Sequence, residues 1–174
     1  MKRSSDNPEQ PSTGFSSDGV DEEIWHRVGV ILAAGQRGDP DEFSRLWQDL
    51  DREVPGFQRG LAGVYVWYLM WHRVAELLGR KPTPEDLHEL AERIYPRFAQ
   101  LIRWDQQRLE DTLATVFQYA PADRQVTGGE LYVAGSAIVS ILLDDPSTQM
   151  AAIRAPLARW YARNGSKLIE LGVT

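Results

Sequence analysis

The chain has 174 residues, a formal net charge of −6 at neutral pH and no cysteine. A chain of this length buries a core without help from a disulfide or a structural metal, so a single domain is expected. The absence of cysteine excludes thiolate metal sites and thiol nucleophiles. The negative charge argues against binding to nucleic acid or to an anionic membrane, because both depend on clustered Lys and Arg.

Residues 1–20 are rich in Ser, Pro, Gly and Asp and contain few large apolar side chains. Such a composition does not offset the entropy of ordering, so we predict a disordered N-terminal tail at 1–20 and a single helical domain at 21–174. The tail also has no apolar stretch of the kind that a secretory signal needs, which favours a cytoplasmic location.

Helix-start signals recur along the rest of the chain. Asp39-Pro40-Asp41-Glu42 and Thr83-Pro84-Glu85-Asp86 each combine an N-cap, a Pro at the first helical position and an acidic residue that reaches back. Thr127-Gly128-Gly129-Glu130 is a further capping box. With apolar residues at helical spacing, these signals predict an all-α bundle of six to seven helices and no strand. The predicted helices lie near 21–36, 40–52, 57–79, 84–102, 105–120, 128–144 and 147–163.

One boundary has an alternative. The apolar stripes of 84–102 and 105–120 are in phase, so they are compatible with one helix, which would be about 55 Å long at about 1.5 Å per residue. That length is too great for a compact domain of this size, and Asp105 serves better as an N-cap. We therefore predict a break at 102–105. Pro96 and Pro156 fall inside helices, where each removes a hydrogen bond and favours a kink.

The most apolar segments are GLAGVYVWYLMW at 60–71 and LYVAGSAIVSILL at 131–143. Both are shorter than the roughly 20 residues that span a bilayer, so we interpret them as buried helices and expect no membrane association. The small residues of the second segment permit close approach to an aromatic-rich partner. The helices near 57–79 and 128–144 are therefore predicted to be central. A homodimer interface and a ligand pocket are alternatives for part of this apolar surface.

Glu-x-x-His occurs twice, at Glu23/His26 and at Glu85/His88. This spacing holds metal ions in helical bundles when its side chains point inward. Here Glu23 and His26 point away from the apolar face of their helix, and the carboxylates around His88 lie behind the apolar face of theirs. We interpret both as surface pairs and predict no metal and no cofactor.

His72 is the strongest candidate for acid–base chemistry. It lies one helical turn after Tyr68 and one turn before Glu76, so Glu76 would orient its ring toward a phenol or a ligand. The favoured interpretation is structural, with His72 at the edge of the core and its nitrogens satisfied by Glu76 and water.

Basic residues form two groups, one around the kinked helix and one near the C-terminal end of the chain. We interpret both as solvated faces, with an anionic partner as the alternative, since no nucleic-acid recognition element accompanies them. The groups are Arg93, Arg97, Arg103 and Arg108, and Arg154, Arg159, Arg163 and Lys167.

The sequence carries neither the strand-to-helix context of a hydrolase nucleophile nor a phosphate-binding loop. The first hypothesis is therefore a non-enzymatic helical binding or scaffold protein, homodimeric, that acts through contact with a protein partner. The second is a sensor or carrier of a small apolar ligand, with a pocket lined by Tyr65, Trp67, Tyr68 and His72. The third is an enzyme that uses His72 as acid or base with Glu76.

Overall fold

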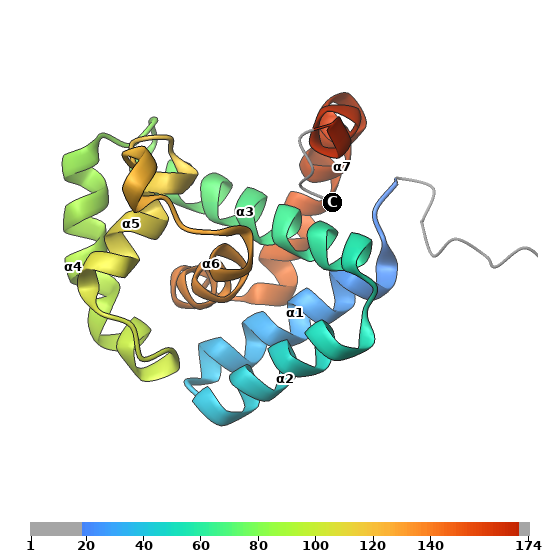
Figure 1. Ribbon diagram of the computed structural model, residues 1–174, viewed down its shortest axis with the longest axis horizontal. Helices are drawn as coiled ribbons and strands as arrows, with labels where there is room; N and C mark the ends of the chain where they lie inside the picture. Colours follow the sequence, from blue (N-terminus) through green and yellow to red (C-terminus); the bar gives the residue numbers. More distant parts are fainter. Residues whose placement is uncertain (1–18, 171–174) are drawn as a thin grey trace, which may run out of the picture.

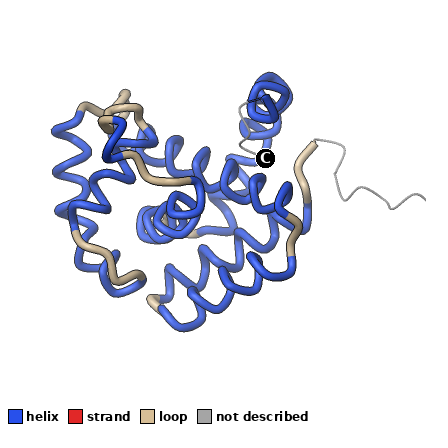
Figure 2. The backbone as a smooth tube through the Cα atoms, viewed as in Figure 1, coloured by secondary structure: helices blue, strands red, loops and turns tan. Residues whose placement is uncertain are grey.

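The computed structural model describes residues 19–170, and their side chains up to residue 164 except that of Phe57. Within this part the chain forms seven α-helices, one short 3-10 helix and no strand, which confirms the all-α prediction (Figure 1). Short loops join the helices except at residues 117–127, where the connection is longer (Figure 2). The helices are α1 (Glu22–Arg37), α2 (Pro40–Glu53), α3 (Gly56–Leu78), α4 (Pro84–Leu101), α5 (Gln106–Val116), α6 (Gly128–Leu142) and α7 (Pro146–Glu170), and the 3-10 helix η1 spans Ala122–Arg124.

The helix starts agree with the predictions because the capping side chains bond as expected. The Oδ1 atoms of Asp39 and Asp105 accept backbone N–H groups three residues further on, at 2.9 and 2.8 Å. Thr83 and Thr127 each complete a reciprocal capping box with an acidic residue. The predicted break at 102–105 is confirmed, since Ile102 has extended backbone and α5 starts after Asp105.

Two helix ends differ from the prediction. The helix predicted at 105–120 ends at Val116, because Gln118 adopts a left-handed backbone with φ of 63° and turns the chain. The short helix η1, which the sequence pattern did not predict, then follows. At the other end of the chain, α7 continues to Glu170, beyond the predicted end at 163.

Helix α6 lies in the middle of the fold, where α1, α3, α4 and α5 all pack against it (Figure 1). Its close contact with α3 depends on glycine. A Cβ atom added at Gly63 of α3 would lie 1.6 Å from Cε1 of Tyr132, and one at Gly135 of α6 would lie 2.8 Å from Cγ1 of Val66. The missing side chains therefore let α3 and α6 approach closely.

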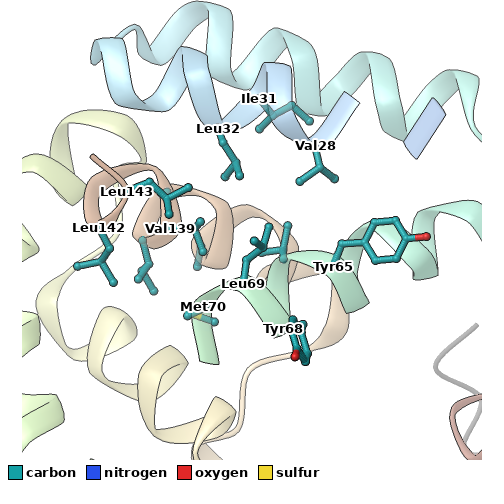
Figure 3. Packing of buried hydrophobic residues seen from close by; sticks show 14 of the residues in the cluster. Val28, Ile31, Leu32, Tyr65, Tyr68, Leu69, Met70, Val139, Leu142 and Leu143 are labelled. Atoms are coloured by element: carbon teal, nitrogen blue, oxygen red, sulfur yellow. The ribbon is translucent and has the colours of Figure 1, made fainter. Parts of the chain in front are cut away.

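The core is continuous across α1, α3 and α6 (Figure 3). Leu32 of α1, Leu69 and Met70 of α3 and Val139 of α6 all belong to this core, and all four side chains are fully buried. Val20, at the end of the predicted tail, is also buried, while residues 1–18 of that tail lie outside the described residues. None of the described helices has the length and apolar character needed to cross a bilayer.

Helix α7 packs against two partners along its length. Its first half lies on α1, where Sδ of Met150 would be 3.3 Å from a Cβ at Gly29. Pro156 lacks an N–H group, so the carbonyl of Ala152 loses its usual helical partner. The last turns of α7 are seen nearly end-on in Figure 1, whereas the first turns run across the view, so the helix changes direction along its length. Its second half then reaches α3 through Trp160.

Candidate ligand-binding site

A cavity of about 690 Å³ lies between α3, the second half of α7 and the segments at 81–82 and 116–118. Helix α3 forms the floor of this cavity with Trp67, Tyr68, Trp71 and Ala75. These positions recur every three to four residues, so they share one side of the helix. We call this cavity the aromatic groove.

One wall of the aromatic groove is α7, which contributes Pro156, Arg159, Trp160 and Arg163. Their spacing again places them along one face of a helix. The Trp160 ring packs on the floor, with its centroid 5.3 Å from that of Trp67 and 5.6 Å from that of Tyr68. This wall therefore presents an indole ring together with two guanidinium groups.

The other wall comes from the loop between α3 and α4 and from the end of α5, through Lys81, Pro82, Val116, Phe117 and Gln118. Tyr119 ties these two segments together. Its hydroxyl donates to the carbonyl oxygen of Pro82 at 2.9 Å, and Nζ of Lys81 lies 5.5 Å from the centroid of its ring. The two segments thus form one surface. In Figure 1 this wall and the last turns of α7 stand apart along α3.

The charge of the aromatic groove is positive. Lys81, Arg159 and Arg163 line it, and none of its described lining residues is acidic. Within the described part of the chain these three cations form no ion pair, and Nε of Arg163 donates only to the carbonyl oxygen of Arg159, at 3.1 Å. Burial raises the pKa of Tyr68, and the charges of Arg159 and Arg163 offset part of that rise. The Tyr68 phenol is therefore a neutral donor at pH 7.

This combination of rings and cations suits one kind of ligand. Aromatic side chains bury a flat or apolar body, and guanidinium groups bind carboxylate or phosphate through paired hydrogen bonds. The cavity also falls within the range of roughly 300–1,000 Å³ that is typical of small-molecule sites. The aromatic groove can therefore hold a small apolar molecule that carries a negative charge.

Of the four residues predicted to line a pocket, two line the aromatic groove and two do not. Trp67 and Tyr68 line the aromatic groove. Tyr65 is instead buried in the core at 1% exposure, where its oxygen accepts the N–H of Asp21 at 3.0 Å and its ring meets the edge of Trp25. His72 is not among the lining residues, although its ring centroid is 6.2 Å from that of Tyr68.

The expected pairing of His72 with Glu76 does not form. Oε2 of Glu76 accepts a hydrogen bond from Nη1 of Arg73 at 2.8 Å, while Nδ1 of His72 is buried without a hydrogen-bond partner. Arg73 also donates to the carbonyl oxygen of Leu142 at 2.8 Å and to Asp144 at 3.0 Å. A buried guanidinium requires such acceptors, and Glu76 therefore pairs with Arg73 and not, as the sequence pattern predicted, with His72.

The Glu-x-x-His pairs do not form a metal centre. Nδ1 of His88 lies 3.0 Å from Oε1 of Glu110, and both side chains reach solvent. Among the described residues, no group of three or more His, Asp or Glu side chains is placed to hold an ion.

Sequence reasoning missed part of the aromatic groove. The spacing of Pro156, Arg159, Trp160 and Arg163 is a signal that could have identified the α7 wall, but arginines one turn apart near a helix end equally predict a solvated face. Lys81 and Gln118 carry no such local signal, because only the tertiary fold brings their segments beside α3. Comparison with protein families, with curated proteins and with solved structures gave no match to this chain.

Proposed function

We propose that this chain is a cytoplasmic, non-enzymatic binding protein that holds a small apolar acid in the aromatic groove. The observation that carries the proposal is the pairing of an aromatic floor with Lys81, Arg159 and Arg163 in a cavity whose described lining has no acidic residue. In a chain of net charge −6, three such cations without a described counter-ion favour an anion supplied by a ligand.

Each part of the aromatic groove has a role in this proposal. The apolar body of the ligand lies on Trp67 and Trp71, where it removes apolar surface from water. The acid group lies at Arg159 and Arg163, one turn apart on α7. A charged hydrogen bond of this kind contributes roughly 1.5–3 kcal/mol, which corresponds to about a 10- to 100-fold change in affinity.

The experiment compares an acid with its neutral amide. We expect 2-naphthoate to quench the fluorescence of groove tryptophans and to bind at least about tenfold more tightly than 2-naphthamide. The double variant Arg159→Gln/Arg163→Gln should lose that preference, because only the acid carries the negative charge that the guanidinium groups pair with. Equal binding of acid and amide to the unaltered protein, or no binding of either, would contradict the proposal.

A matched control distinguishes the effect of the groove arginines on affinity from the effect of lowering the total positive charge of the protein. Arg45→Gln/Arg52→Gln removes the same charge from α2, where both arginines pair with Asp49 on the surface at 2.9 and 2.7 Å. We expect this variant to bind 2-naphthoate as the unaltered protein does. A loss of affinity in both double variants would indicate a general charge effect and not a site.

Contact with a second copy of the chain is the competing proposal, and the exposure of Trp71 favours it. This side chain is 40% exposed at the floor of the aromatic groove, where a second copy would cover it. Native mass spectrometry distinguishes the two proposals. A monomer that retains one molecule of 2-naphthoate supports the ligand, whereas a dimer that excludes 2-naphthoate supports the interface.

A further inference from the structure

Gln118 has a backbone conformation that is costly for its residue type. It is the one non-glycine residue with positive φ in the described chain, at 63°. Its N–H donates to the carbonyl oxygen of Thr115 at 3.1 Å, and the N–H of Tyr119 donates to that of Ala114 at 2.7 Å. These two bonds are the Schellman arrangement that ends a helix, and its left-handed position favours glycine.

The end of α1 provides the comparison within the same molecule. Gly38 occupies the left-handed position there, with φ of 72°. The same two hydrogen bonds form, from Gly38 to Gly35 at 3.0 Å and from Asp39 to Ala34 at 3.3 Å. A Cβ atom at Gly38 would meet nothing within 4 Å, so glycine is present for its backbone freedom and not for lack of space. At the end of α5 the same left-handed position is occupied by Gln118, which lacks the backbone freedom of glycine.

The Gln118 side chain is exposed and forms no hydrogen bond within the described chain that would offset the cost of its left-handed backbone. It does line the aromatic groove, on the wall that also holds Lys81 and that stands apart along α3 from the arginines of α7. A residue that costs stability and contributes only to a cavity wall is a candidate for recognition of what the cavity holds.

We infer that Gln118 determines ligand specificity, by hydrogen bonding through its amide to a neutral polar group on the apolar acid. This inference rests on the proposed function. An amide both donates and accepts, so it pairs with a hydroxyl or carbonyl group. The floor from Trp67 to Ala75 spans nine residues, which is about 12 Å along α3. The acid therefore carries its second polar group at the end remote from the carboxylate, about two fused rings away.

The test uses 2-naphthoate and 6-hydroxy-2-naphthoate with the full chain. We expect the unaltered protein to bind the hydroxylated acid about tenfold more tightly, because only that acid reaches the Gln118 amide. Gln118→Gly should make the affinities for the two acids equal within about twofold, while it raises the Tm by about 2–4 °C. Gln118→Asn, which keeps an amide on a residue that tolerates positive φ, should retain part of the preference.

The reciprocal control is Gly38→Gln. It places glutamine in the same Schellman motif away from the aromatic groove, so it should lower the Tm and leave both affinities unchanged. Equal binding of the two acids to the unaltered protein, or a preference that survives in Gln118→Gly, would overturn the inference and leave the groove as a binding site. Failure of 2-naphthoate to bind the unaltered protein would overturn the proposed function and this inference together.

Discussion

The two sides of α3 meet their neighbours in opposite ways. Toward α6, glycine on one helix faces a larger side chain on the other, as with Gly63 and Tyr132, so the surfaces interlock. Toward α7, both helices contribute large rings, and the centroids of Trp67 and Trp160 lie 5.3 Å apart. Two large rings in contact keep the backbones of α3 and α7 further apart than a glycine facing a ring does for α3 and α6. One helix therefore has a closed side and an open side, according to the size of the residues it faces.

The cations follow the same division. On the closed side, the guanidinium of Arg73 is buried and satisfied by Leu142, Glu76 and Asp144. On the open side, Arg159 and Arg163 face the aromatic groove without a carboxylate among the described residues. Arg73 serves the fold, while the arginines of α7 are available to a ligand.

The largest expected effect comes from truncation on the two sides. Leu69 has no exposed surface, so Leu69→Ala should lower the free energy of unfolding by about 2–5 kcal/mol. Trp71 is 40% exposed, so Trp71→Ala should cost less than about 1 kcal/mol and still weaken the binding of 2-naphthoate. Urea unfolding measures both variants. Comparable losses of stability would show that the open side belongs to the core.

A smaller effect tests the interlocking of α3 and α6. Gly63→Ala places a methyl group 1.6 Å from the present position of Cε1 of Tyr132, so the ring must move. We expect a loss of about 1–3 kcal/mol in the free energy of unfolding. Gly129→Ala, which meets nothing within 4 Å, should change stability by less than about 1 kcal/mol. In a double-mutant cycle with Tyr132→Ala the losses should not add, and additive losses would contradict the contact.

The helix starts were predictable because their causes are local. Asp39, Thr83, Asp105 and Thr127 each bond to backbone a few residues away, so the residues beside each cap determine the start. The end of α5 was not predictable on this basis. Gln118 occupies a position that usually carries glycine, and no stop signal precedes Pro121.

The aromatic groove was predictable only in part, because periodicity does not identify what covers a helix. On an apolar helix such as α3, Tyr65 and Tyr68 are equivalent in sequence terms, yet Tyr65 packs against α1 and Tyr68 meets α7. The pairing of His72 with Glu76 failed for a similar reason. The competing Arg73 is adjacent in sequence, but the end of α6, which orients it, is 69 residues away.

The smallest expected effect concerns the start of α6 and depends on pH. The guanidinium of Arg108, followed by hydrogen bonds from Thr127, lowers the pKa of Glu130 from 4.5 to about 2. A carboxylate with a lowered pKa in the folded state stabilises the fold above its unfolded pKa, and this contribution is lost as the pH falls from about 4.5 to about 2. Glu130→Gln keeps a side chain that suits the capping box and removes the charge.

The difference in free energy of unfolding between the unaltered protein and Glu130→Gln should therefore be greatest near neutral pH and should shrink below pH 4.5. Urea unfolding at a series of pH values measures it. Glu89→Gln is the matched control, because Glu89 is exposed on α4 and its carboxylate forms no ion pair with a described residue, so this variant should show a smaller dependence. A difference that stays constant down to pH 2 would assign the effect to the shape of the cap, because only the ion pair with Arg108 requires the charged carboxylate.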